Sequence, residues 1–281
     1  MSNAEYFAAT ELREALRLLA ERGDRITILA GGTDLAPQFN CRELRPQAIL
    51  YIGKLGLNYI TANNGGLAIG AATTLEDIAT SRLVSERAPM LGQTAAEMGN
   101  PAIRNVATIG GNIAMASRAA DMPPPLLALD AELVLASERG ERVLPIGEFF
   151  KRAHKTIRLS DELLTEIRIP SVNGQTAFVR HGRRKVFSCC VASAAVRVVM
   201  DGGKCADARI VAGSMASTAI RCLGAEGVLT GKDLTSELAG EAAAQAVGEC
   251  KPIDDERATA WYRRKVIKVL IERAINQASG L

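Results

Sequence analysis

The sequence is poor in aromatic residues, histidine and clustered cysteine. Aromatic side chains make up 4% of its 281 residues, with one tryptophan, which argues against a nucleic-acid surface built on base stacking. None of its 6 cysteines forms a Cys-x-x-Cys pair or a cluster with the 2 histidines. The sequence therefore predicts no zinc or iron–sulfur site within this chain.

Long hydrophobic runs are also absent. The longest uncharged apolar stretch, residues 186–196, is far shorter than the roughly 20 residues that span a bilayer. Residues 1–16 become charged at once and lack the apolar core of a secretory signal. With 48% hydrophobic and 23% charged residues, the composition is that of an ordinary globular protein. We expect a soluble, cytoplasmic protein that binds neither membrane nor nucleic acid.

Several common site signatures are missing as well. No Gly-x-Gly-x-x-Gly follows the first predicted strand, which argues against a Rossmann nucleotide site. Gly231-Lys232-Asp233 lacks the upstream glycine and the hydroxyl of a P-loop. No Gly-x-Ser-x-Gly elbow or Ser-His-Asp order is present, which argues against a serine-hydrolase site.

The net charge of +3 is spread along the chain, apart from two dense basic runs. The first is Arg180-His181-Gly182-Arg183-Arg184-Lys185 and the second is Arg263-Arg264-Lys265. Both runs fit a solvated surface, and both also fit a docking patch for an acidic partner.

Hydrophobic periodicity and turn residues predict an α+β protein. Helices are expected at 10–22 (Thr10 as N-cap, Gly23 as the end), from Thr74 (with Asp77 in a capping box), at 90–98 and at 257–277. Strands are expected at 26–29, 48–52, 132–136, 162–169, 177–180, 188–200 and 208–213, and a hairpin at 58–71. The polar segment 171–175 is the best linker candidate. Strands first and helices afterwards predict an α+β second domain.

Two segments contain a glycine pair followed by polar side chains: residues 28–35 and 108–113. We interpret each as a glycine turn at or near a strand end. Main-chain N–H groups converge on phosphate oxygens only where no Cβ blocks the approach, and glycine provides that space. One such pair is usually a tight turn, whereas two with polar residues following favour a diphosphate site.

These segments resemble the motifs of a known family. They are similar to motifs of the FAD-binding medium subunit of the xanthine dehydrogenase and carbon monoxide dehydrogenase family of molybdenum hydroxylases. The first motif is Ala30-Gly31-Gly32-Thr33-Asp34-Leu35. The second is RNVATIGGNI at residues 104–113, followed by Ser117, Asp121 and PPPLLALDAEL (123–133). Residues 226–231 and 254–264 resemble that family's second domain. The resemblance covers essentially the whole chain.

The resemblance implies a fold and a domain division. It implies a two-part FAD-binding domain over 1–172, with a small α/β part over about 1–55 and a larger, mostly antiparallel part over 56–172. A smaller C-terminal domain of antiparallel sheet with helices would follow over 176–281. The larger part would carry the second glycine pair.

The resemblance also implies FAD as cofactor, bound without any catalytic residue or metal ligand from this chain. The expected cofactor-binding residues are Ile28, Leu29, Ala30, Gly31, Gly32, Thr33, Asp34, Leu35, Met98, Thr108, Ile109, Gly110, Gly111, Asn112, Ser117, Asp121 and Leu164. Electrons would pass from a large molybdenum-cofactor subunit through a small iron–sulfur subunit and FAD to NAD or another acceptor. The cofactor would do the redox work, and the protein would bind, orient and tune it.

Two departures from the family pattern stand out. Relatives often place a lysine after the linker, where this chain has Val179, and the adjacent Arg180 would point to the opposite face of a strand. The branch that reduces aromatic thioesters carries a cysteine-rich insertion, but this chain has no cysteine between Cys41 and Cys189. That branch is therefore not expected.

Two other functions remain open at this point. One is a stand-alone flavin reductase similar to the cell-wall enolpyruvyl-sugar reductases, against which the match of residues 226–264 weighs. The other is a non-catalytic binding protein in which both glycine pairs form structural turns.

Overall fold

A computed structural model describes residues 4–184 and 188–281. Lys185 of the first basic run, and residues 186 and 187 of the longest apolar stretch, lie outside the described residues. In the part that is described, no helix is long and apolar enough to cross a membrane.

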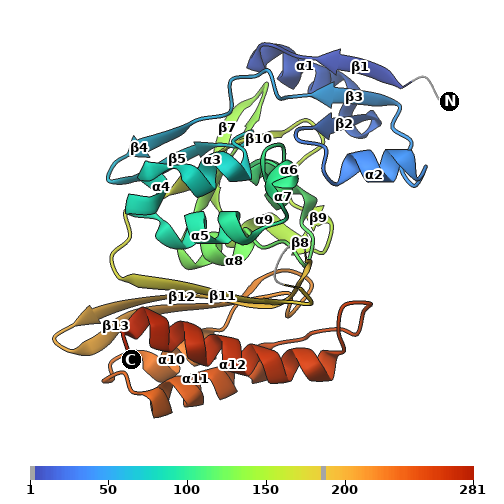
Figure 1. The fold of residues 1–281 in the computed structure, drawn as a ribbon. Helices are drawn as coiled ribbons and strands as arrows, with labels where there is room; N and C mark the ends of the chain where they lie inside the picture. The colour runs from blue at the N-terminus through green and yellow to red at the C-terminus, as the bar shows by residue number, and fades with distance from the viewer. Residues whose placement is uncertain (1–3, 185–187) are drawn as a thin grey trace.

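The first part of the chain is a small α/β layer, drawn in blue in Figure 1. It contains β1 (Glu5–Ala8), α1 (Leu12–Arg22), a 3-10 turn (Gly23–Arg25), β2 (Ile26–Leu29), α2 (Leu35–Asn40) and β3 (Ala48–Tyr51). The strands pair in parallel in the order β1-β3-β2; α1 connects β1 to β2, and α2 lies in the crossover from β2 to its neighbour β3. Leu16 and Leu19 of α1 are buried in this part's core.

The start of α1 differs from the expectation, while its end confirms it. The predicted N-cap Thr10 is wrong, because the helix begins at Leu12 with Glu11 in the cap position and no side-chain cap. The Thr10 N–H instead donates to the Glu14 carboxylate at 3.3 Å. Gly23 ends the helix with a φ of 53°, as predicted.

The second part is built on a five-stranded antiparallel sheet in the order β4-β5-β10-β6-β7. Its strands are β4 (Ile60–Asn63), β5 (Gly66–Gly70), β6 (Glu132–Ser137), β7 (Gly140–Pro145) and β10 (Leu163–Ile169), and a small hairpin joins β8 (Phe150–Arg152) to β9 (Lys155–Thr156). The predicted hairpin is confirmed, with Asn64 and Gly65 at φ 45° and 83° in its turn.

Short helices cover this sheet. They are α3 (Leu75–Thr80), α4 (Arg82–Arg87), α5 (Pro89–Glu97), α6 (Pro101–Arg104), α7 (Ile109–Met115), α8 (Pro123–Ala128) and α9 (Ile146–Phe149). The predicted capping box of α3 is confirmed, because the Asp77 N–H donates to the Thr74 hydroxyl and the Thr74 N–H donates to the Asp77 carboxylate.

The interpretation of the second glycine pair as a turn is wrong. Gly110 and Gly111 lie in the first turn of α7, and Thr108 is its N-cap, with its hydroxyl accepting from the Gly111 N–H at 3.1 Å. A hydroxyl that binds the N–H of the third helical residue closes a helix start. The local pattern Thr-x-Gly-Gly therefore begins a helix here.

The C-terminal part is a sheet in the order β11-β12-β13-β14 with three helices. Its elements are β11 (Gln175–Gly182), β12 (Cys190–Asp201), β13 (Lys204–Gly213), β14 (Ile220–Arg221), α10 (Leu223–Leu229), α11 (Ser236–Glu249) and α12 (Ala260–Ser279). Figure 1 shows α10–α12 on one face of this sheet and α5 and α8 on the other. The α+β class and the two-part first domain are confirmed.

Successive residues of β11 face the two layers alternately. Phe178 joins the core of the second part, and Val179 packs against the C-terminal core. Arg180 points back to the second part, where its Nη2 donates to Asp121 at 3.1 Å. This alternation confirms that Val179 and Arg180 serve opposite faces.

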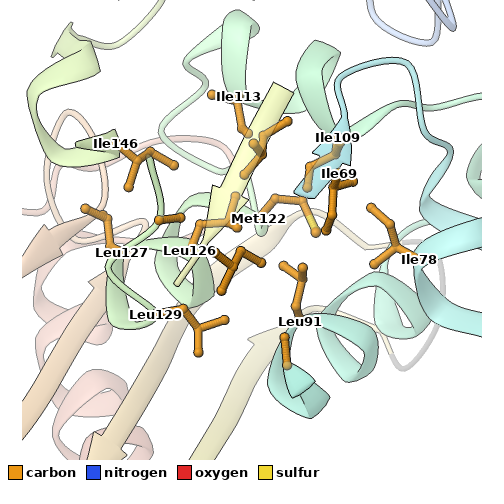
Figure 2. Close-up of a cluster of buried hydrophobic side chains, with 14 of the residues drawn as sticks. Ile69, Ile78, Leu91, Ile109, Ile113, Met122, Leu126, Leu127, Leu129 and Ile146 are labelled. Atoms are coloured by element: carbon orange, nitrogen blue, oxygen red, sulfur yellow. The ribbon is translucent and has the colours of Figure 1, made fainter. Parts of the chain in front are cut away.

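Helix α8 is attached to the C-terminal sheet at both ends by ion pairs. Asp121, just before α8, pairs with Arg180 of β11. Asp130, just after α8, accepts from Arg197 of β12 at 2.8 Å and from Arg209 of β13 at 3.1 Å. Between these pairs, Met122, Leu126 and neighbouring apolar side chains fill the core shown in Figure 2.

The second basic run is only partly at the surface. Arg263 is fully buried, and its guanidinium donates to the Val191 carbonyl at 2.8 Å and to the Asp255 carboxylate at 2.6 Å. Arg264 and Lys265 are exposed. Arg263 therefore stabilises the fold, and only its two neighbours can meet a partner.

We predict that Asp130→Asn lowers the free energy of unfolding by about 2 kcal/mol, because the side chain of Arg197, 5% exposed, would lose the nearer of its two carboxylate partners and keep only Asp207. Asparagine tolerates the left-handed φ of 50° at this position, so backbone strain is not added. Urea unfolding measures the change. Asp201→Asn, an exposed aspartate on β12, is the matched control; equal stability losses in both variants would contradict the role of the ion pair.

Asp255 is expected to make the fold sensitive to acid. Burial opposes its ionisation, but hydrogen bonds from Arg257 and the charge of Arg263 hold the pKa of the Asp255 carboxyl well below its usual range. A depressed folded-state pKa gives stability that is present above the unfolded pKa of about 3.9 and is lost as pH falls toward the folded pKa. Asp255→Asn should therefore flatten the fall in stability between about pH 5 and pH 2. An unchanged slope in urea titrations across that range would refute this.

Candidate functional site

The loop between β2 and α2 carries a row of open main-chain donors. The N–H groups of Gly31, Gly32, Thr33 and Asp34 donate no hydrogen bond to any described residue, and Gly32 has a φ of 71°. The loop closes through the Ala36 N–H, which donates to the Gly32 carbonyl at 2.8 Å. Consecutive free N–H groups in such a turn form a concave site for an anion.

Gly31 brings the two glycine segments into contact. A Cβ on Gly31 would lie 1.7 Å from the Val106 carbonyl oxygen and 3.1 Å from the Cα of Ala107. Only a residue without a side chain permits this approach of main chain to main chain. The open loop therefore lies directly beside the segment that leads into α7.

The second segment offers no comparable row of open amides. The N–H of Ile109 donates to Thr73 O at 3.0 Å, that of Gly110 to Ala71 O at 2.9 Å, and that of Asn112 to Thr108 O at 3.0 Å. The Gly111 N–H is bound by the Thr108 hydroxyl. Open main-chain amides are therefore found at residues 31–34, whereas those of residues 109–112 are already bonded within the fold.

The two glycines of α7 have different surroundings. Gly110 is buried, and a Cβ there would lie 2.6 Å from both the carbonyl oxygen and the Cβ of Ala71. Gly111 is exposed, and the nearest atom to its Cβ position is the Thr108 hydroxyl at 2.9 Å. Gly110 thus permits packing of α7, whereas Gly111 presents a bare surface to a ligand.

Four buried side-chain oxygens have no hydrogen-bond partner among the described residues: Asn112 Oδ1, Asp121 Oδ1, Ser193 Oγ and Asn276 Oδ1. The first two belong to residues of the predicted cofactor site. Burial raises the pKa of the Asp121 carboxyl, and the charge of Arg180 opposes that shift. Buried acceptors without a donor are costly, so such atoms often mark a place where a ligand donates. The Asn112 and Asp121 oxygens fit a cofactor that carries hydroxyl or imide donors.

The remaining predicted residues fall into two groups. Thr33, Asp34 and Ser117 are polar and at least partly accessible, although Asp34 accepts from Gln38 at 2.6 Å and the Ser117 hydroxyl accepts from the Ala119 N–H. The others contribute to cores: Ile109 and Leu164 are buried, and Ile28, Ala30 and Met98 are partly buried against apolar clusters. Leu29 and Leu35 are half-buried at the two ends of the open loop.

Sequence reasoning did not identify Val106 and Ala71 as the main-chain neighbours of the two glycine segments. The contact of Val106 with Gly31 is through its main chain, and Ala71 contacts Gly110 through its carbonyl and its Cβ, so neither contact leaves a distinctive side chain in the sequence. Arg180, considered as part of a surface basic run and as a replacement for a lysine, is the buried cation that faces Asp121.

Comparison with known proteins defines the class. A family described as "FAD binding domain in molybdopterin dehydrogenase" matches residues 2–172, and one described as "CO dehydrogenase flavoprotein C-terminal domain" matches residues 177–278. The chain therefore belongs to the FAD-binding subunits of the molybdenum hydroxylase family, and FAD is its cofactor. The members of this family are subunits of oxidoreductases.

Particular relatives match over almost the whole chain. The 6-hydroxypseudooxynicotine dehydrogenase complex subunit alpha of Paenarthrobacter nicotinovorans is 36% identical, over 98% of this chain and 94% of the relative. The glyceraldehyde dehydrogenase medium chain of Sulfolobus acidocaldarius is 33% identical, over 98% of both. In the solved carbon monoxide dehydrogenase of Hydrogenophaga pseudoflava, the matching chain superposes with a TM-score of 0.95 at 32% identity, covering 99% of this chain and 97% of that one.

We predict that Gly31→Ala reduces bound FAD at least tenfold, because its methyl group would push the open loop away from Val106. Heat-released flavin per chain, measured by absorbance, reports the loss. Gly227→Ala, a helical glycine whose Cβ would meet nothing within 4 Å, is the matched control. Wild-type flavin content in Gly31→Ala would show that the contact is dispensable.

Proposed function

We propose that this chain is the electron-transfer flavoprotein subunit of a molybdenum hydroxylase complex. In that role, electrons from iron–sulfur clusters on a partner subunit would reach NAD or another acceptor through the FAD bound here. The open amides of residues 31–34, in contact with the start of α7, are the observation that carries the proposal. The family match over both parts of the chain supports it.

The proposed task of the open loop is to hold the diphosphate of FAD. Four unpaired N–H groups provide directed donors without a basic side chain, and each charge-assisted hydrogen bond contributes roughly 1.5–3 kcal/mol. The bare surface of Gly111 would let the cofactor approach α7 closely. The expected contacts of Ile28–Leu35, Met98, Thr108–Asn112, Ser117, Asp121 and Leu164 remain our proposed cofactor site.

Asn112 and Asp121 are proposed to orient the cofactor. Each presents a buried oxygen with no protein donor, and a hydroxyl or imide N–H of the cofactor would satisfy it. Arg180 fixes the other Asp121 oxygen, and Ser188 O accepts from the same Arg180 nitrogen at 2.8 Å. When bound, FAD supplies the redox chemistry, so no acid, base or nucleophile is assigned to this chain.

The metal centres of the reaction are proposed to lie on other subunits. No group of three or more potential metal-ligating side chains gathers within residues 4–184 and 188–281. We therefore propose a large molybdenum-cofactor subunit and a small iron–sulfur subunit as partners. The 6 cysteines are free thiols, which supports a reducing, cytoplasmic location.

The division of the chain is also a proposal. We place an FAD-binding domain at 1–172, with parts at about 1–55 and 56–172, and a C-terminal domain at 176–281. The chain crosses between them just before β11 begins at Gln175. Because α8 packs on β12 and β13 through buried apolar groups and ion pairs, we expect the two domains to move as one body.

The test of the proposed function is co-expression with large and small subunits of the same genome, followed by native mass spectrometry. We predict a complex in which FAD bound to this chain is reduced when the substrate of the large subunit is added without oxygen. Gly31→Ala should assemble yet show no flavin bleaching. A wild-type chain that binds FAD but remains alone, or whose FAD stays oxidised in the complex, would refute the proposal.

A further inference from the structure

Helix α12 exposes a basic and aromatic face. Trp261, the only tryptophan of the chain, is 67% exposed at the start of the helix, and Tyr262 beside it is 39% exposed. Lys265, Lys268 and Val269 follow Trp261 at intervals of about one turn and are also exposed. Trp261, Tyr262 and Val269 are exposed together on one helix, and grouped exposed apolar side chains mark interaction surfaces more often than single ones do.

The cations on this face have no acidic partner among the described residues. Arg264, Lys265 and Lys268 form no ion pair, whereas buried Arg263 of the same helix is paired with Asp255. Glu272, the one acidic residue of α12, follows Lys268 by about one turn and forms no ion pair with it. The positive charge of this face is therefore not paired within the described residues.

This face continues into a cleft next to the proposed cofactor site. The Tyr262 hydroxyl lies 3.1 Å from His181 Nε2, and Arg183 Nη1 donates to the Glu256 carbonyl at 3.3 Å. His181 and Arg183 line a cleft of about 480 Å³ together with Arg180, whose guanidinium binds Asp121. A partner seated on α12 would thus lie close to the residues that we assign to FAD.

The side chains around this face of α12 indicate which class of partner it can bind. The apolar stripe of α12, with Ile267 and Ile271, is buried in the C-terminal core, so the helix cannot insert into lipid. An extended polyanion such as a nucleic acid would meet Glu256, whose side chain is 84% exposed, and the exposed Glu237 and Glu241 of neighbouring α11. A smaller acidic patch on a folded protein can contact the cations of α12 without extending to Glu256, Glu237 or Glu241.

We propose that Trp261, Arg264, Lys265 and Lys268 form a docking surface for an acidic face on another subunit of the hydroxylase. Trp261 supplies the apolar anchor, since tryptophan, tyrosine and arginine dominate the binding energy of protein interfaces. The three cations supply orientation and a fast, salt-dependent association. This inference rests on the proposed function, because it requires that partner subunits exist.

The experiment measures the affinity of the purified FAD-loaded chain for the purified complex of its large and small subunits. Arg264→Glu/Lys265→Glu/Lys268→Glu should weaken binding at least thirtyfold, and Trp261→Ala roughly thirtyfold. The matched control is Lys204→Glu/Lys232→Glu/Lys251→Glu, which reverses three exposed cations elsewhere in the same domain and should change the affinity less than about threefold. FAD content and melting temperature confirm that every variant is folded.

The salt dependence of the affinity separates the electrostatic contribution of the three cations from the apolar contribution of Trp261. Wild-type binding should weaken as ionic strength rises, and the α12 triple variant should lose most of that dependence, while Trp261→Ala keeps it. If the α12 triple variant binds like the control variant, the docking surface is refuted and the proposed function stands. If the wild-type chain binds no subunit at all, the proposed function fails and the inference fails with it.

Discussion

The contact of Gly31 with the main chain of Val106 is the constraint on which the rest of the site depends. It joins a loop of the small α/β part to the segment that begins α7 in the larger part. Because no side chain intervenes, the loop with four open amides lies against the residues that lead into α7, the helix that carries Gly111 and Asn112. A diphosphate placed there would touch both parts of the domain, so cofactor binding and the packing of these parts reinforce each other.

A second set of contacts attaches this site to the C-terminal sheet. Asp121 and Asp130 lie at the two ends of α8 and each holds arginines of β11, β12 or β13. The buried side of α8 meanwhile belongs to the core in Figure 2. One oxygen of Asp121 holds Arg180, and the other, which has no partner among the described residues, is the one we propose for the cofactor.

Much of the fold could be predicted from the sequence because its signals were local. Asn64 and Gly65 adopt the positive φ of a tight turn between two neighbouring strands. The capping hydrogen bonds of Thr74 and Asp77 join residues three positions apart. The interpretation of Gly110 and Gly111 as a turn is wrong because the pattern Thr-x-Gly-Gly is compatible with both a glycine turn and a Thr-capped helix start. The contacts Gly31–Val106 and Asp130–Arg197 join distant residues through geometry alone, so no local pattern could predict them. The family resemblance identified the cofactor, and the hydrogen bonds identified which amides remain open to it.

We propose that the open amides between β2 and α2 hold the diphosphate of FAD, and a crystal structure of the FAD-loaded chain would test this. We predict phosphate oxygens within about 3.2 Å of at least two of the N–H groups of residues 31–34, with Gly31 still against Val106. A diphosphate bound elsewhere, with these four amides facing only water, would contradict it.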